Sequence, residues 1–174
     1  MRRVGPRAAL FFAVASMSAA VTTAACSQAS DRAFYSDVDD QKLQAARDLA
    51  VKTLPQFWAK FAANAPGYSA FLLKVGLPTD DGRGEEEIWM QVERRTDDGD
   101  AVGLLANQPF HLSKLHAGSR IEVAPSRFVD WSYTKDGKTY GQYSTRALYE
   151  RASPEQRAEV DVKLAPTPLE PETN

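Results

Sequence analysis

The chain has 174 residues, of which 43% are hydrophobic, and it carries a formal net charge of −2 with a single cysteine. This length suits one domain with a substantial core, and the mild negative charge argues against a nucleic acid as partner, because phosphate binding requires a basic face. A single cysteine cannot form an intramolecular disulfide, so the fold must be stabilised by burial of apolar side chains.

The first 25 residues have the pattern of an export signal. Arginines at positions 2, 3 and 7 precede an uncharged stretch at residues 8–21, which is shorter than a membrane-spanning helix. Small residues follow and lead directly to Cys26. We therefore expect a signal peptide at 1–25 and export of the protein to the periplasm or cell envelope.

The segment that ends at Cys26 resembles a bacterial lipobox, although Thr23 stands where leucine is usual. The resemblance implies a lipid on Cys26, a membrane anchor of several acyl chains and a short tether at residues 26–36. Ser27, in place of the aspartate that favours the inner membrane, implies sorting to the outer membrane. The alternative is a plain secretory signal that is cut after Ala25 or a little later.

A helix with a kink at Pro55 is expected from Asp37 to Ala63, where apolar residues recur at helical spacing. About six strands follow, at residues 70–75, 87–94, 101–106, 120–123, 128–134 and 138–148. They are mostly antiparallel because the turns between them are short. Asp136-Gly137 is a strong hairpin signal and predicts that Tyr133 faces Tyr140.

A short helix from Ser153 to about Leu164 and a disordered, proline-rich tail at 165–174 complete the expected elements. Residues 37–164 then form one domain of the α+β class. Its kinked N-terminal helix covers one face of a curved, mostly antiparallel sheet of about six strands. The sheet is either open or closed into a small barrel.

Five short segments resemble the YegJ-like bacterial domain of unknown function (domain of unknown function 2314). They are EEIW at 86–89, GLLANQP at 103–109, LHAGSRIEV at 115–123, FVDWSY at 128–133 and YGQYSTRALY at 140–149. With the preceding helix, the resemblance covers residues 40–149. It implies a single helix-plus-sheet domain and supplies no activity, cofactor or catalytic residue.

Glu87 and Trp89 are the first candidates for a ligand-binding site. They are two residues apart on a strand and share a face, where an acid beside an indole can form a floor for sugars or peptides. The alternative is that Trp89 packs under the helix and Glu87 is solvated. Asn107, at a strand end, either lines a pocket mouth or caps backbone groups.

Asp130 and Trp131 are adjacent, so they point to opposite faces and only one of them can join a given site. The hairpin register places Asp130 opposite Tyr143 and near Arg146, which would make a polar cluster. The alternative is that Asp130 satisfies a backbone turn or pairs with an arginine.

No pattern in the sequence predicts a catalytic centre, a metal site or a cofactor. His111 and His116 lack zinc-ligand spacing, and no nucleophile elbow or phosphate-binding glycine loop is present. We expect a non-catalytic envelope lipoprotein whose domain binds a partner protein or a small ligand. The alternatives are a carboxylate-dependent hydrolase of cell-wall or sugar substrates, using Glu87 and Asp130, and a factor that masks another envelope protein.

Overall fold

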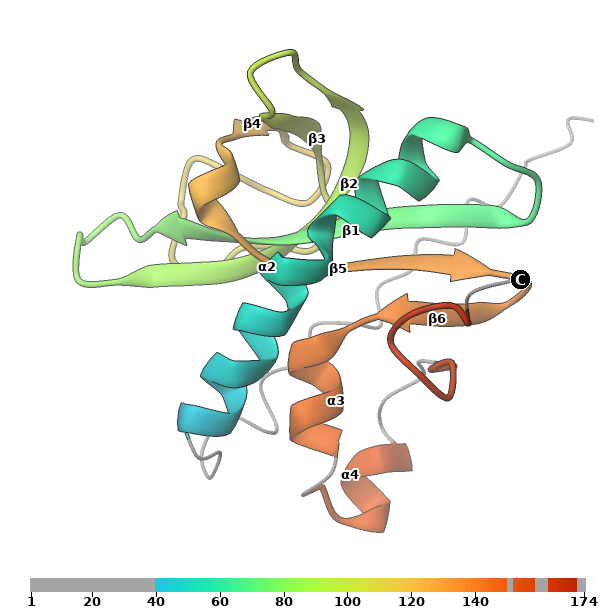
Figure 1. Ribbon diagram of the computed structural model, residues 1–174. Coiled ribbons are helices and arrows are strands. Elements are labelled where there is room, and N and C mark those ends of the chain that lie inside the picture. Colours follow the sequence, from blue (N-terminus) through green and yellow to red (C-terminus); the bar gives the residue numbers. More distant parts are fainter. Residues whose placement is uncertain (1–39, 150–151, 159–162, 172–174) are drawn as a thin grey trace, which may run out of the picture.

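The computed structural model describes residues 40–149, 152–158 and 163–171 (Figure 1). The predicted signal peptide at 1–25, the lipidation residue Cys26 and the tether at 26–36 lie outside these residues. Within the described ranges, no helix combines the length and the apolar character needed to cross a membrane.

Six strands form one antiparallel sheet in the order β4-β3-β2-β1-β5-β6 (Figure 1). The sheet is open, with β4 and β6 at its edges, so the α+β prediction is confirmed in its open form. The strands are β1 (Tyr68–Pro78), β2 (Glu85–Arg95), β3 (Ala101–Leu105), β4 (Arg120–Val123), β5 (Phe128–Lys135) and β6 (Lys138–Gly141). A single 3-10 turn (Pro125–Arg127) joins β4 to β5.

Helix α2 (Asp40–Ala63) crosses one face of the sheet diagonally, and it also packs against α3 (Tyr143–Tyr149) (Figure 1). Pro55 lies inside this helix and removes one backbone donor from it. Close by, the indole N–H of Trp131 lies 3.0 Å from the carbonyl oxygen of Ala50 and 3.1 Å from the hydroxyl of Thr53. This buried contact joins the middle of α2 to β5.

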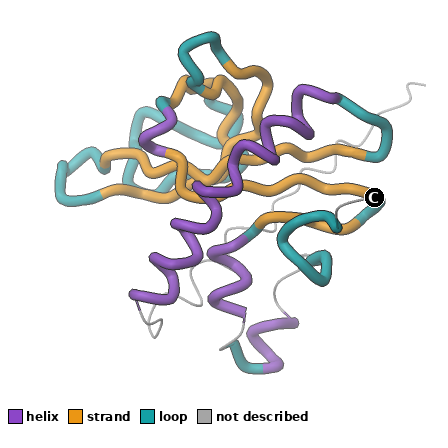
Figure 2. Tube along the Cα trace, viewed as in Figure 1, coloured by secondary structure: helices purple, strands orange, loops and turns teal. Residues whose placement is uncertain are grey.

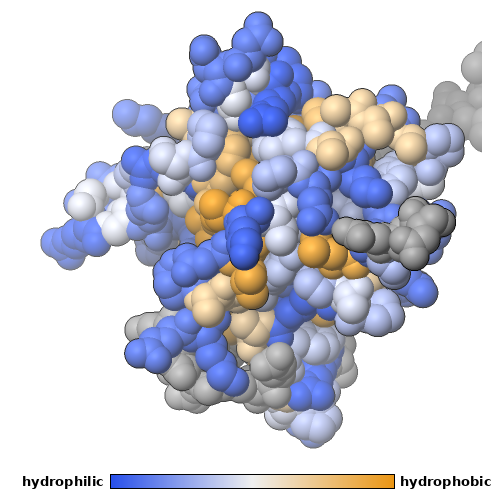
Figure 3. Space-filling model, in the orientation of Figure 1, coloured by the Kyte–Doolittle hydropathy of each residue, from blue (hydrophilic) through white to orange (hydrophobic). Residues whose placement is uncertain are grey.

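The core between α2 and the sheet is largely aromatic. The Phe57 ring lies 5.8 Å from Trp131 and 5.7 Å from Phe71, and Trp131 stacks on Tyr133 at 5.6 Å between ring centroids. Large aromatic side chains bury much apolar area each, so one helix and one sheet suffice for a core. In Figure 3, which views the molecule from the same side as Figure 1, apolar residues lie near the middle and hydrophilic residues surround them.

The hairpin at Asp136-Gly137 is confirmed. Both residues have positive φ, 49° and 74°, as a tight two-residue hairpin turn requires. Tyr133 is the register partner of Tyr140, as the sequence predicts.

Residues 142–148 were expected to continue the last strand, and this expectation is wrong. β6 ends at Gly141 and α3 follows. Gly141 and Gln142 have φ values of 72° and 56°, which turn the chain out of the sheet. A Cβ at Gly141 would lie 2.2 Å from the carbonyl oxygen of Trp131, so the close approach of the two strands requires glycine there.

The C-terminal part also differs from expectation. Helix α4 (Pro154–Ala158) does not extend to Leu164, which instead forms a parallel bridge with Thr139 of β6. Residues 163–171, which we call the strap, run beside the last strand as a loop (Figure 2). The amide of Ala165 donates to the Thr139 carbonyl at 2.8 Å, and that of Gly141 donates to Pro168 at 2.8 Å.

The predicted disordered tail at 165–174 is therefore wrong for residues 165–171, and residues 172–174 lie outside the description. The strap is ordered because it satisfies backbone groups along the edge of β6, a partner that proline-rich composition cannot reveal.

Candidate functional site

A row of three side chains crosses the middle of the sheet. Lys74 of β1 is the register partner of Trp89 on β2 and of Asp130 on β5. Directly opposed residues project from the same face, so the three side chains lie side by side. Glu87, two residues before Trp89, projects from that face as well. The residues of the next row, which point to the core beneath α2, are Leu73, Met90 and Trp131.

Lys74 is buried, with 1% of its surface exposed, and it is surrounded by compensating groups. Its ammonium nitrogen lies 3.9 Å from Glu87 Oε2 and 5.3 Å from the centroid of the Trp89 ring. Arg47 of α2 forms an ion pair with the other oxygen of Glu87. Two cations thus face two acids, and we call Arg47, Lys74, Glu87 and Asp130 the sheet charge cluster.

The carboxylate of Asp130 is buried and occupied by backbone donors. Oδ1 accepts hydrogen bonds from the amides of Trp131 at 2.8 Å and Tyr143 at 3.2 Å, and Oδ2 accepts one from Ser144 at 2.7 Å. Burial raises the pKa of the Asp130 carboxyl above its ordinary value, and the Ser144 amide and the charge of Lys74 oppose that rise. Asp130 therefore holds the first turn of α3 against β5.

This geometry does not present two acids to a substrate. A glycoside hydrolase needs a general acid and a second carboxylate on either side of an accessible bond. Asp130 is 2% exposed and engaged by amides, while Glu87 is held by Arg47 and Lys74. The sheet charge cluster positions α2 and α3 instead.

The other predicted site residues are dispersed around this cluster. Asp130 and Tyr143 do meet, as the hairpin register indicates, but through the Tyr143 amide and not its hydroxyl. Trp131 points to the opposite face, and Asn107 is buried just beyond the end of β3. Sequence reasoning missed Lys74, although a single lysine in an apolar strand is the signal that could have identified it.

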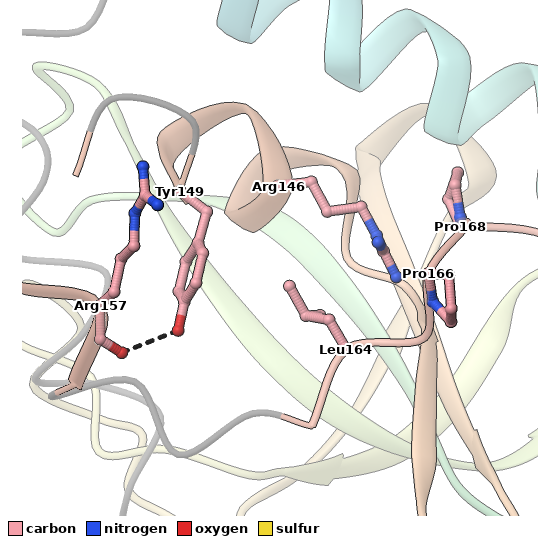
Figure 4. A pocket seen from close by; sticks show the side chains of 6 residues that line it. All are labelled: Arg146, Tyr149, Arg157, Leu164, Pro166 and Pro168. Atoms are coloured by element: carbon pink, nitrogen blue, oxygen red, sulfur yellow. Dashed lines mark hydrogen bonds between the residues drawn. The ribbon is translucent and has the colours of Figure 1, made fainter. Parts of the chain in front are cut away.

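Arg146 lies outside the sheet charge cluster. It lines an open hollow of about 570 Å³ between α3, α4 and the strap (Figure 4). Its guanidinium is fixed by carbonyl oxygens, with Nε 2.7 Å from Gly141 and Nη1 2.9 Å from Ala165. Burial lowers the pKa of Arg146, yet guanidinium groups keep their charge in proteins. The lining residues are Arg146, Tyr149, Arg157, Leu164, Pro166 and Pro168.

On the side of the hollow away from Arg146 lie Tyr149, at the end of α3, and Arg157 of α4. The Tyr149 hydroxyl donates to the carbonyl oxygen of Arg157 at 2.7 Å, and the Arg157 guanidinium lies 6.0 Å from the Tyr149 ring centroid (Figure 4). Leu164 lies between these two residues and Arg146. We call this site the arginine hollow. Guanidinium groups beside apolar surface suit a ligand with an anionic group and an apolar body.

The residues described here contain no group of three or more His, Cys, Asp or Glu side chains that could hold a metal ion. His116 instead pairs with a neighbour in its own loop, with Nδ1 3.0 Å from the Ser119 hydroxyl.

Comparisons with known proteins place the domain among bacterial sequences. The family described as "Uncharacterized protein conserved in bacteria (DUF2314)" matches residues 40–165. The uncharacterised protein YegJ of Escherichia coli is 27% identical over 143 residues, which are 82% of this chain and 90% of the relative. A putative ankyrin repeat protein of Neisseria meningitidis is 27% identical over 134 residues, which are 74% of this chain but 53% of the relative. No solved structure matches.

Proposed function

Because this chain belongs to the DUF2314 family of bacterial proteins, whose description gives no activity, we propose a function from the residues themselves. The protein is a non-catalytic envelope lipoprotein whose domain binds an anionic ligand with an apolar body in the arginine hollow. The observation that carries this proposal is the hollow itself, where Arg146 and Arg157 border an apolar wall of Leu164 and two prolines.

Three properties of the hollow support binding. Its volume of about 570 Å³ lies in the range of small-molecule sites. Arg146 is held in place by backbone carbonyls, so its charge is oriented before a ligand arrives. The two arginines that border the site favour an anionic ligand there, although the chain as a whole carries a net charge of −2.

The probe 1-anilinonaphthalene-8-sulfonate tests this proposal, because it joins a sulfonate to apolar rings. We expect saturable binding to the intact protein and about tenfold weaker binding to Arg157→Gln, the loss that one charge-assisted hydrogen bond represents. The matched control is Arg83→Gln, which removes an arginine from the exposed turn between β1 and β2. Equal binding by both variants would overturn the proposal. The unfolding midpoint is measured alongside, because the dye also binds loosened cores.

The lipid anchor is a separate part of the proposal and rests on residues 1–26. A basic start, a short apolar run and small residues before Cys26 support export and lipidation. Ser27 further supports the outer membrane. Cells fed a palmitate analogue should tag the wild type and not Cys26→Ala, and only the wild type should remain with the membrane fraction. Tagging of both proteins, or of neither, would contradict the anchor.

A further inference from the structure

The carboxylate of Glu170, near the end of the strap, is surrounded by four donors from the body of the domain. The Tyr68 hydroxyl lies 2.9 Å from both carboxylate oxygens, and the Tyr133 hydroxyl donates to Oε1 at 2.8 Å. The Lys135 ammonium donates to Oε2 at 2.6 Å, and the Lys60 nitrogen lies 3.4 Å from Oε1. We call Lys60, Tyr68, Tyr133 and Lys135 the carboxylate cradle.

The cradle is built on rigid elements that do not belong to the strap. Tyr68 and Tyr133 come from the neighbouring strands β1 and β5, with ring centroids 5.6 Å apart. The ammonium groups of Lys60 and Lys135 lie 5.4 Å and 5.1 Å from the Tyr68 ring centroid. Donors placed by strands and a helix are ordered in advance, which lowers the entropic cost of binding an acid.

The cradle opens to solvent through its two lysines. The Lys60 and Lys135 side chains are 38% and 33% exposed, whereas Tyr133 beneath them is 2% exposed. Burial alone would raise the pKa of the Glu170 carboxyl, but hydrogen bonds from Lys135, Tyr133 and Tyr68 outweigh it and lower the pKa to about 2. The group bound in the cradle is thus an ionised carboxylate, and without it the site would hold two positive charges.

We propose that the cradle is a carboxylate-recognition site, which the strap fills with Glu170 and which an acidic, proline-flanked segment of a partner protein takes over. The strap itself displays the chemistry of such a segment, because its sequence PTPLEP at 166–171 places the acid between Leu169 and Pro171. Proline stiffens the flanking chain and reduces the entropy lost on binding. Glu170 competes from within the same chain, so a partner gains access when its own contacts outweigh that local competition.

Chemical rescue tests whether the site recognises a carboxylate. Glu170→Ala empties the cradle, and acetate is small enough to occupy the space. We expect acetate, at constant ionic strength, to raise the thermal midpoint of Glu170→Ala by about 3 °C or more, as ligand binding to the folded state does. The neutral isostere acetamide should not raise it, and neither should acetate in the double variant Glu170→Ala, Lys135→Met. Equal effects of acetate and acetamide would overturn the proposal.

A labelled peptide tests takeover by an external segment. PTPLEP should bind Glu170→Ala at least about tenfold more tightly than it binds the wild type, and PTPLQP should bind neither protein. Failure of PTPLEP to bind Glu170→Ala overturns the proposal even where acetate rescues stability, because the cradle then serves only the strap. Loss of dye binding in Arg157→Gln reports on the arginine hollow and is read separately.

Discussion

In the sheet charge cluster, Lys74 is almost fully buried between Glu87 and Asp130, whereas Arg157 of the arginine hollow is exposed to solvent. The cluster matches each charge with an internal partner, and its amide contacts fix where α3 begins. In the hollow, backbone carbonyl oxygens hold Arg146, and both arginines line the site together with Leu164 and two prolines. Comparing the two regions shows that charged residues enclosed by partners help to build the fold, whereas the arginines of the hollow lie beside apolar residues at the surface of the molecule.

The largest effect should follow from breaking the cluster. Lys74→Met leaves Asp130 buried without its neighbouring cation, which costs about 3–5 kcal/mol of unfolding free energy. Urea unfolding near pH 7 measures the loss. The matched control is Arg94→Met on β2, whose side chain is 56% exposed and which should change stability by less than about 0.5 kcal/mol. Similar losses of unfolding free energy in both variants would show that the buried charges stabilise the fold no more than an exposed charge does.

The stability loss in Lys74→Met should depend on pH. Burial raises the pKa of Asp130 in the folded state, so the folded protein binds this proton more tightly than the unfolded chain does. The resulting stabilisation is present at low pH and is lost as pH rises through the folded pKa. Without Lys74 that folded pKa should rise further. The stability difference between wild type and Lys74→Met should therefore shrink on acidification, as urea unfolding over a pH series can measure.

The next effect concerns Gly141, which precedes α3. This helix contacts Asp130 of the sheet charge cluster and carries Arg146 and Tyr149 of the arginine hollow. Gly141→Ala forces a Cβ against the Trp131 backbone at positive φ and should cost about 2–4 kcal/mol. Gly137→Ala is the matched control, because its φ is also positive but no atom lies within 4 Å of the new Cβ. It should cost about 1 kcal/mol. Thermal or urea unfolding compares them, and equal losses would contradict the steric argument.

A smaller effect on stability is expected in the carboxylate cradle. Its ion pair between Lys135 and Glu170 is more exposed than the sheet charge cluster and less exposed than Arg157 of the hollow. The pKa of Glu170 is lowered to about 2, so its stabilisation is present above the ordinary carboxyl pKa and is lost as pH falls toward 2. Glu170→Gln should cost about 1–2 kcal/mol near pH 7, and the difference from wild type should vanish near pH 2. A difference that is independent of pH would contradict the ionised contact.

The smallest effect on stability should come from the hollow. Arg157→Gln removes an exposed side chain and should change the unfolding free energy by less than about 0.5 kcal/mol while it weakens dye binding. Weaker dye binding at nearly unchanged stability would distinguish the hollow from the cluster, where substitution lowers the unfolding free energy. A large loss of stability in Arg157→Gln would place this arginine among the structural charges.

Much of the architecture was predictable because it depends on local patterns. The helix before Ala63, the six-stranded antiparallel sheet and the Asp136-Gly137 hairpin follow from apolar periodicity and turn chemistry, and the resemblance to the YegJ-like family is confirmed. The candidate site was predicted only in part. The hairpin register brings Asp130 to Tyr143, but nothing in the sequence shows that Lys74 lies between Asp130 and Trp89, since that depends on the order of the strands.

The sequence by itself determined which segments alternate, where the chain turns and which residues carry charge, because these depend on neighbours a few residues away. Only the tertiary structure decided that β6 stops at Gly141, that the proline-rich strap lies along this strand and that Glu170 meets donors from α2, β1 and β5. The physical reason is that these outcomes arise from close approach and hydrogen bonding between residues far apart in the chain, which no local pattern records.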